Sequence, residues 1–413
     1  MDLPTLDEVD VAGKTVIVRV DINSPIDPET GEILDDTRIR ESAVTIKELA
    51  RKGAKIVLLA HQGRLDEPDF TILEKHAKKL SETTGLKVVY IMDAFYGPKA
   101  HEAITAMQPG EVVLLENVRF LAEESVARTL EQQAKTRLVS QLAPLAQIFV
   151  NDAFAAAQRP HASILGFAAV LPSYAGRLME KEIKGMSRSL SPEHPCVYLL
   201  GGAKCEDVIK IMEHSLSKGL VDTVLTGGIL ANIFLMVSGR DIGGPNVKII
   251  MDKHDSKMID RAKKLFSTYD DKIKTPVDFV VDVQGKPKVI SLEELPKNLE
   301  IYDIGPKTIA AYSKVLANAK TIVAKGPMGM FERKGFEQGT YEMFRAMASS
   351  RGFKILGGGH TVAVANAAGV AGKIDHISTG GGAAVSFLSG EPMPGIEALL
   401  YSKRRFRQNG DSK

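Results

Sequence analysis

Cationic and polar side chains come directly after several strand-like segments in the first half of the sequence. In chain order they are Asp21, Asn23, Arg38 (at a helix start), His61, Arg64, Arg119, Arg159 and His161. Ligands of open parallel α/β sheets bind at the carboxyl ends of the strands. The guanidinium fork of arginine matches the oxygens of phosphate and carboxylate groups. The pattern therefore predicts a pocket for a small, strongly anionic molecule.

Each of these residues also has an ordinary structural explanation. A single arginine is more often an exposed or ion-paired surface residue than a ligand. Asp21 is equally suited to a helix cap or a turn. The recurrence of such groups after successive strands, rather than any one of them, favours the binding site.

Glycine clusters follow the strand-like segments of the second half instead. They are "GGAK" (201–204), "GGI" (227–229), "KGPMGMFE" (325–332), "GGGHT" (357–361) and "TGGGA" (379–383). Glycine lets backbone N–H groups approach phosphate oxygens, and a following helix N-terminus adds positive potential. Because neither G-x-x-x-x-G-K-[ST] nor G-x-G-x-x-G occurs, the predicted nucleotide site is neither a Walker-type site nor a dinucleotide fingerprint.

Two side chains next to these glycines carry chemistry of their own. Lys204 would reach a phosphoryl group in transfer, and Glu332 would accept hydrogen bonds from a ribose. A solvated helix start and a surface carboxylate are the alternative explanations. An anion pocket in one half and a nucleotide pocket in the other supply the positioning and positive charge that phosphoryl transfer requires. The pattern predicts a kinase or another nucleotide-dependent transferase.

The elements that must position these groups alternate between short β-branched segments and longer helical patterns, as in parallel α/β folds. A helix is predicted where Ile39, Ala43, Ile46 and Ala50 share one face. A long helical stretch is also expected after Phe120. The predicted strands are residues 15–20, 55–60, 87–91, 111–116 and 147–152, then 196–202, 222–228, 321–327 and 353–359.

The predicted fold class is α/β, with two doubly wound parallel-sheet domains joined by a helical hinge. Residues 1–172 would form the first domain and residues 196–400 the second. A connecting helix and hinge would occupy 173–195, and a basic tail would occupy 401–413. The segment "LPSYAGRLMEKEIKGM" (171–186) is read as one helix.

Composition excludes several classes of protein. The 53 basic and 51 acidic residues leave a net charge of +2, which does not indicate nucleic-acid binding. Cys196 and Cys205 form neither a disulfide framework nor a zinc motif. The acidic N-terminus "MDLPTLDEVD" is unlike a signal peptide, and no apolar run approaches the ~18 residues of a membrane span. We therefore expect a cytoplasmic protein.

Taken together, the motifs resemble those of the phosphoglycerate kinase family. From about Val18 to Leu400 the family's order is kept by "RVDIN", "TRIR", "HQGR", "LLENVRF", "NDAF", "GGAK", "KGPMGMFE", "GGGHT" and "STGGGA". The resemblance implies reversible phosphoryl transfer between 1,3-bisphosphoglycerate plus ADP and 3-phosphoglycerate plus ATP. It also implies in-line transfer in a cleft closed by hinge bending, and Mg²⁺ carried with the nucleotide.

The resemblance further implies a set of site residues. The phosphoglycerate site of the N-terminal domain would comprise Asp21, Asn23, Arg38, His61, Arg64, Arg119 and Arg159. The nucleotide site of the C-terminal domain would comprise Lys204, Glu332, Gly358, Gly359, His360 and Thr361. Arg38 and Lys204 would be catalytic, because both would stabilise the moving phosphoryl group. No residue is assigned as a metal ligand.

Four positions differ from the commoner family pattern and together resemble its archaeal branch. Gln158, Val208, Lys325 and His360 stand where a histidine, a lysine, an asparagine and an aspartate are usual. Imidazole is a poor ligand for Mg²⁺, so His360 is expected to donate to a phosphate oxygen or a metal-bound water, or else to be structural. Lys325 either replaces the charge missing at Val208 or faces solvent.

Two other classes of protein share part of this pattern. A non-catalytic solute receptor also closes two α/β lobes on an anion, and a nicotinamide-dependent dehydrogenase also binds a nucleotide but needs a glycine fingerprint that is missing here. The expected partners are the phosphoglycerates and ADP or ATP. Neither nucleic acid nor membrane is expected, and the protein is expected to be a monomer or a weak oligomer.

Overall fold

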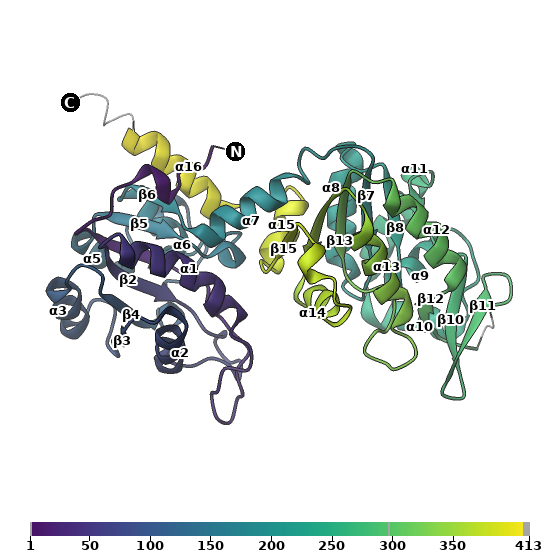
Figure 1. Ribbon diagram of the computed structural model, residues 1–413, viewed down its shortest axis with the longest axis horizontal. Coiled ribbons are helices and arrows are strands. Elements are labelled where there is room, and N and C mark those ends of the chain that lie inside the picture. Colours follow the sequence, from purple (N-terminus) through teal and green to yellow (C-terminus); the bar gives the residue numbers. More distant parts are fainter. Residues whose placement is uncertain (1, 296–297, 408–413) are drawn as a thin grey trace. The chain divides into compact units, whose positions relative to one another are not determined.

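The computed structural model describes residues 2–295 and 298–407, and its contacts divide the chain into two compact units (Figure 1). The first unit contains residues 1–183 and 392–413, and the second contains residues 184–391. Helix α7 (Arg177–Ser187) carries the chain from one unit to the other. No helix in the described part of the chain is long and apolar enough to cross a membrane.

The first unit is built on a six-stranded parallel sheet in the order β3-β4-β2-β1-β5-β6. Its strands are β1 (Thr15–Arg19), β2 (Lys55–Ala60), β3 (Val88–Tyr90), β4 (Val112–Asn117), β5 (Ile148–Asn151) and β6 (Ser173–Ala175). Its helices are α1 (Thr37–Arg51), α2 (Glu74–Thr84), α3 (Pro98–Ala106), α4 (Leu130–Gln133), α5 (Arg137–Leu142), α6 (Ala162–Leu165) and α16 (Pro394–Arg407).

Helices cover both faces of this sheet. Successive side chains of a strand point to opposite faces, and Val16 and Val18 of β1 pack with α1 and α2, whereas Ile17 packs with α3 and α5. The central strand β1 is therefore buried along its whole length and apolar in its middle, as expected for a parallel sheet that is buried on both sides.

The second unit repeats this plan with a parallel sheet in the order β15-β14-β13-β7-β8-β9. Its strands are β7 (Cys196–Leu200), β8 (Thr223–Thr226), β9 (Ile273–Lys274), β13 (Thr321–Lys325), β14 (Phe353–Gly357) and β15 (His376–Ser378). Its helices are α8 (Cys205–Ser217), α9 (Gly228–Val237), α10 (Gly244–Lys253), α11 (Ser256–Tyr269), α12 (Pro306–Ala317), α13 (Gln338–Ser349), α14 (Gly359–Ala367) and α15 (Gly382–Leu388). The predicted fold class, two parallel-sheet α/β domains, is confirmed.

A three-stranded antiparallel sheet was not predicted. It consists of β10 (Asp278–Val283), β11 (Lys286–Ser291) and β12 (Ile301–Ile304), in the order β11-β10-β12. Gln284 and Gly285 form the turn between β10 and β11 with φ of 54° and 80°. Positive φ at both central residues is the geometry of a two-residue hairpin turn.

Two predicted helices are wrong in part. Residues 171–186 are not one helix, because β6 pairs with β5 and α7 begins only at Arg177. Asp152 fixes that start, since its Oδ1 accepts hydrogen bonds from the N–H groups of Leu178 (2.9 Å) and Met179 (3.2 Å). The long helix expected after Phe120 is divided into the short α4 and α5.

The end of the chain also differs from the predicted division. Helix α16 belongs to the first unit, although residues up to 400 were expected in the second domain. The hydroxyl of Ser402 donates to the carbonyl of Leu171 (3.1 Å) and accepts from the N–H of Ser173 (3.0 Å), which ties α16 to β6. Of the predicted basic tail, residues 408–413 lie outside the described residues.

Candidate active site

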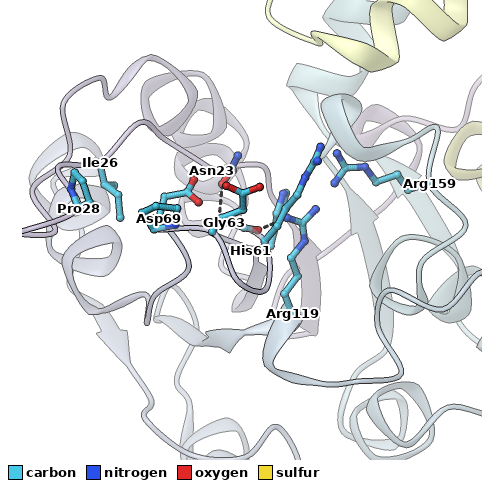
Figure 2. A pocket seen from close by; sticks show the side chains of 11 residues that line it. Asn23, Ile26, Pro28, His61, Gly63, Asp69, Arg119 and Arg159 are labelled. Atoms are coloured by element: carbon cyan, nitrogen blue, oxygen red, sulfur yellow. Dashed lines mark hydrogen bonds between the residues drawn. The ribbon is translucent and has the colours of Figure 1, made fainter.

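A cavity of about 380 Å³ lies at the carboxyl ends of the central strands of the first unit (Figure 2). Strands β4, β2, β1 and β5 are neighbours, so the loops that follow them meet there. In Figure 2, Arg119 and Arg159 approach the cavity from different segments of the chain. The lining residues are Asn23, Ile26, Pro28, His61, Gly63, Arg64, Glu67, Pro68, Asp69, Arg119 and Arg159.

Five of the seven predicted phosphoglycerate-site residues line this cavity, and Asp21 and Arg38 form a pair of their own. Nη1 of Arg38 donates to Oδ1 (3.2 Å) and Oδ2 (3.1 Å) of Asp21. The Arg38 side chain is 31% exposed and that of Asp21 is 3% exposed. Asp21 also accepts from the N–H of Asn23 (3.2 Å), so it both shapes its turn and holds Arg38.

Hydrogen bonds between loops hold the cavity wall in place. Oδ1 of Asn23 accepts from the N–H of Gly63 (2.8 Å), and the guanidinium of Arg119 donates to the Gly63 carbonyl. The amide of Asn117, at the end of β4, donates to the carbonyls of Gln62 (2.8 Å) and Thr71 (2.9 Å). The loops after β1, β2 and β4 are thus tied to one another.

Three arginines, Arg64, Arg119 and Arg159, line the cavity together with two carboxylates, Glu67 and Asp69. The side chains of Arg64 and Arg159 make no hydrogen bond or ion pair within the described part of the chain, although both line the cavity. Burial and then the charge of Arg159 lower the pKa of Arg119 to about 10. Burial and the charge of Arg64 likewise lower the pKa of Arg159. The positive charges of these arginines thus repel one another, and an anion bound among them relieves that repulsion.

The two histidines of this region are neutral. Burial, followed by the charges of Arg19 and Arg119, lowers the pKa of His61 well below its ordinary value. Burial, followed by the charge of Arg159, lowers the pKa of His161 to about 3. In neutral imidazole one ring nitrogen donates and the other accepts. Because Nδ1 of His61 faces a donor of Arg19, Nε2 is left to donate to a substrate without adding a further positive charge.

Sequence reasoning missed a buried pair of charges behind the cavity. Nε of Arg19 donates to Oγ of Ser163 (2.8 Å), and that hydroxyl donates to Oε1 of Glu124 (2.6 Å). Nη2 of Arg19 also lies 3.0 Å from Nδ1 of His61. Arg19 and Glu124 are each 1% exposed. Through His61, which lines the cavity, this buried network reaches the cavity wall.

A second cavity, of about 430 Å³, lies within the second unit, where the loops after β7, β8, β13 and β14 meet. Lys204, Glu332, Gly358, Gly359 and Thr361 all line it. Residues from four of the five glycine clusters take part, whereas residues 379–383 do not line it. The side chain of His360 lies outside the described residues, although its backbone belongs to the first turn of α14.

Glycine is required where two of these loops touch. A Cβ atom at Gly201 would lie 2.2 Å from the carbonyl oxygen of Pro327, and one at Gly326 (φ 80°) would lie 2.2 Å from that of Gly201. The hydroxyl of Thr361 accepts from the N–H of Gly326 (3.1 Å) and ties the third loop to them. This close approach leaves a wall of backbone around the cavity.

Lys204, Lys253 and Lys325 line this cavity, and two of them, Lys204 and Lys325, belong to its glycine loops. Lys204 precedes the first turn of α8, and its side chain makes no hydrogen bond or ion pair with a described residue. Nζ of Lys325 lies 3.9 Å from Oδ2 of Asp207, and its side chain is 15% exposed. Burial and the charge of Lys204 lower the pKa of Lys325. The cavity thus has two cationic groups close to its glycine loops.

The chain is similar to phosphoglycerate kinases in both sequence and structure. The family model "Phosphoglycerate kinase" matches residues 6–391. A protein of Methanococcus maripaludis with that name is 48% identical over 98% of this chain and 99% of its own length. One of Methanothermus fervidus is 47% identical over 97% and 98%. The crystal structure of phosphoglycerate kinase from Pyrococcus horikoshii is 41% identical, covers 98% of this chain and 100% of that one, and superposes with a TM-score of 0.89.

Proposed function

Because the chain belongs to the phosphoglycerate kinase family, we propose that it transfers the phosphoryl group directly, in line, between the ligands of its two cavities. As an enzyme of this family it is a kinase of glycolysis, which transfers a phosphoryl group from 1,3-bisphosphoglycerate to ADP, giving 3-phosphoglycerate and ATP, or in the reverse direction. The cavity lined by Arg64, Arg119 and Arg159 would bind the phosphoglycerate, and the cavity lined by glycine loops would bind the nucleotide. A location in the cytoplasm fits such an enzyme.

The observation that carries this proposal is the difference between the two cavities. One is walled by three guanidinium groups, of which those of Arg64 and Arg159 have no partner among the described residues, and the other by backbone, apolar side chains and three lysines. A phosphoglycerate has charged groups at both ends, which suits several guanidinium forks. A nucleotide places its phosphates against N–H groups and its base against apolar side chains.

Catalysis would rest on positioning and positive charge. The carboxylate of 3-phosphoglycerate attacks the γ-phosphorus of ATP, the bond to the β-γ bridging oxygen breaks, and no proton has to be removed from the nucleophile. Arg38 and Lys204 would stabilise the charge on the moving phosphoryl group. Arg38 is held by Asp21 at 31% exposure, so it is ordered and still accessible to a ligand.

The placement of each cavity inside one unit supports the proposal of hinge closure. All lining residues of the first cavity belong to the first unit, and all those of the second to residues 184–391. In-line transfer requires reacting atoms to be about 3–3.5 Å apart, so the units would close on the substrates, with α7 and the segment between residues 391 and 392 as the two covalent connections.

Magnesium would be held chiefly by the nucleotide. Among the described residues no group of three or more His, Cys, Asp or Glu side chains is arranged to hold a metal ion. Mg²⁺ in kinases is usually bound by one or two carboxylates together with substrate phosphates. Asp207, beside Lys325, is a carboxylate that fits this need. The ion would neutralise phosphate charge during transfer.

Two measurements test the proposal. ATP consumption that depends on 3-phosphoglycerate should be observed with Mg²⁺, and its absence in folded protein would contradict the assigned activity. Small-angle scattering should show a smaller radius of gyration with 3-phosphoglycerate and a non-hydrolysable ATP analogue together than with either alone. If the enzyme is active and its radius of gyration does not change, hinge closure is contradicted and the assigned activity is not.

A further inference from the structure

A half-buried carboxylate, Asp69, stands in the wall of the arginine-lined cavity of the first unit. It makes no ion pair with a described residue, although three arginines line the same cavity. In Figure 2, Asp69 lies toward the end of the cavity where Ile26 and Pro28 are. Arg119 and Arg159 lie toward the other end. The cavity therefore has a cationic end and an end that carries negative charge.

The side chain of Gln62 holds this carboxylate. Nε2 of Gln62 donates to Oδ2 of Asp69 (3.3 Å) and to the carbonyl of Ser24 (3.0 Å). Oε1 of Gln62 accepts from the N–H of Ser24 (2.9 Å). Because the N–H of Ser24 can only donate and its carbonyl can only accept, the orientation of the Gln62 amide is fixed. The amide therefore presents a donor to Asp69.

His76, on α2, provides the fourth contact of the same amide. It is 1% exposed, and its Nε2 lies 2.9 Å from Oε1 of Gln62. Because Oε1 is an acceptor, Nε2 of His76 carries the proton. Gln62 and His76 are both buried and do not line the cavity, so they act on a ligand only by holding the loop of Asp69. That loop is also packed closely, since a Cβ atom at Gly63 would lie 2.5 Å from the carbonyl oxygen of Asp69.

A carboxylate fixed in this way changes which anions the cavity accepts. Several guanidinium groups attract any anion, and the attraction grows with the charge of the ligand. Discrimination among anions therefore requires a repulsive group as well as attractive ones. Asp69 supplies that group, whereas Glu67, which also lines the cavity, is exposed and better screened by water. Arg38, assigned to the transferred phosphoryl group, does not line the cavity, so the repulsion acts on the part of the substrate that stays bound.

We propose that Asp69 is a specificity-determining residue, which limits the negative charge that the first cavity accepts from its ligand. This inference rests on the proposed phosphoglycerate site. A ligand with one phosphate inside the cavity places that group among the arginines and leaves the end at Asp69 free of charge. A second phosphate inside the cavity lies closer to the carboxylate and is repelled by it. The site thereby favours 3-phosphoglycerate over more highly phosphorylated analogues.

Calorimetric titration of 3-phosphoglycerate and of 2,3-bisphosphoglycerate, in which a second phosphate replaces the hydroxyl group, tests the proposal. Each Kd is measured at the same ionic strength, because salt screens the repulsion. The wild type should bind 3-phosphoglycerate more tightly than the bisphosphate. Asp69→Asn keeps an acceptor for Gln62 and loses the charge. It should lower the Kd of the bisphosphate by about tenfold and that of 3-phosphoglycerate by less than about threefold.

A second variant in the same loop separates this effect from a change in overall charge. Asp66→Asn is the matched control, because Asp66 is exposed and does not line the cavity. It should keep the wild-type ratio of the two Kd values. Asp69→Ser repeats the measurement if the asparagine variant does not fold. Saturating 3-phosphoglycerate should prevent the bisphosphate from binding, and bisphosphate that still bound to another place on the protein would overturn the proposal.

The outcomes distinguish this inference from the proposed activity. An Asp69→Asn protein with the wild-type ratio would show that Asp69 serves the fold alone and would overturn the proposal, as would a wild type that prefers the bisphosphate. If that ratio stays unchanged in a protein that consumes ATP with 3-phosphoglycerate, only the selection by Asp69 is contradicted. If the ratio shifts as expected in a protein that consumes no ATP, the selection is supported and the proposed activity is contradicted.

Discussion

Replacing the buried Arg19 with methionine is expected to destabilise the first unit severely. The substitution removes the donors to Oγ of Ser163 (2.8 Å), to the carbonyl of Val20 and to Nδ1 of His61 (3.0 Å). It also leaves Glu124 without the cation that most strongly favours its ionised form. Because Glu124 is 1% exposed, water cannot replace that cation without local opening.

The magnitude follows from the uncompensated charge. Arg19 and Glu124 are bridged by the Ser163 hydroxyl rather than in direct contact, and removing one of two compensating buried charges typically costs up to about 3–5 kcal/mol, a large part of the roughly 5–15 kcal/mol by which domains are stable. Burial already raises the pKa of Glu124, and the loss of Arg19 raises it further. A carboxyl group whose pKa is raised on folding takes up protons more readily in the native state, so the deficit of the variant should shrink as the pH falls toward 4.5.

Urea unfolding at pH 7 and pH 5 measures this deficit, and a double variant tests its cause. Arg19→Met with Glu124→Gln should recover about 2 kcal/mol relative to the sum of the single changes, because no unpaired charge remains. Arg64→Met is the matched control, since Arg64 is exposed and without a partner among the described residues, and it should change stability by no more than about 0.5 kcal/mol. A loss below about 1 kcal/mol for Arg19→Met, or strict additivity in the double variant, would refute the reasoning.

Three further predictions concern other positions. Arg38→Ala should lower kcat by about 10²–10³, whereas Arg64→Ala should mainly raise the KM for 3-phosphoglycerate; the assigned role is wrong if Arg38→Ala changes only KM. Lys325→Ala should raise the KM for ATP or lower kcat several-fold. Unchanged kinetics would show that Lys325 does not replace the positive charge that is missing at Val208. Burial raises the pKa of Asp152 to about 7, so the wild type should lose stability relative to Asp152→Asn as the pH rises from 4 to 7. A difference in Tm between the two proteins that is the same at pH 5 and pH 8 would contradict this.

The strands of the two parallel sheets could be predicted because burial on both faces leaves a run of apolar residues that few other elements share. β2 occupies residues 55–60 as predicted. The segment after Phe120 was mistaken for a long helix because apolar spacing does not reveal capping. Thr129 accepts from the N–H of Gln132 (3.3 Å), and the side chain of Gln132 accepts from the N–H of Thr129 (3.1 Å), so a new helix starts there.

The candidate site could be predicted where a residue follows a strand, and not where it lies inside one. Arg19 is the last residue of β1 and is buried among apolar neighbours, so nothing in its local sequence distinguishes it from an edge cation. Its partners His61, Glu124 and Ser163 lie 42 to 144 residues away. A network of this kind exists only after the sheet has brought the four segments together.

The electrostatics of the first cavity favour a binding site over a purely structural cluster. A structural cluster of arginines would be expected to neutralise each guanidinium with a carboxylate, as Asp21 does for Arg38 at 3.1 Å. Arg64 and Arg159 make no ion pair with a carboxylate among the described residues, and the pKa of Arg119 is lowered by burial and then by the charges of neighbouring arginines. The native fold therefore keeps these arginines close enough to repel one another. A bound dianion would remove that repulsion, whereas the stability of the fold alone does not explain why the arginines are there. The lowered pKa of His61 fits the same argument, because a charged imidazole there would add to the repulsion among the arginines.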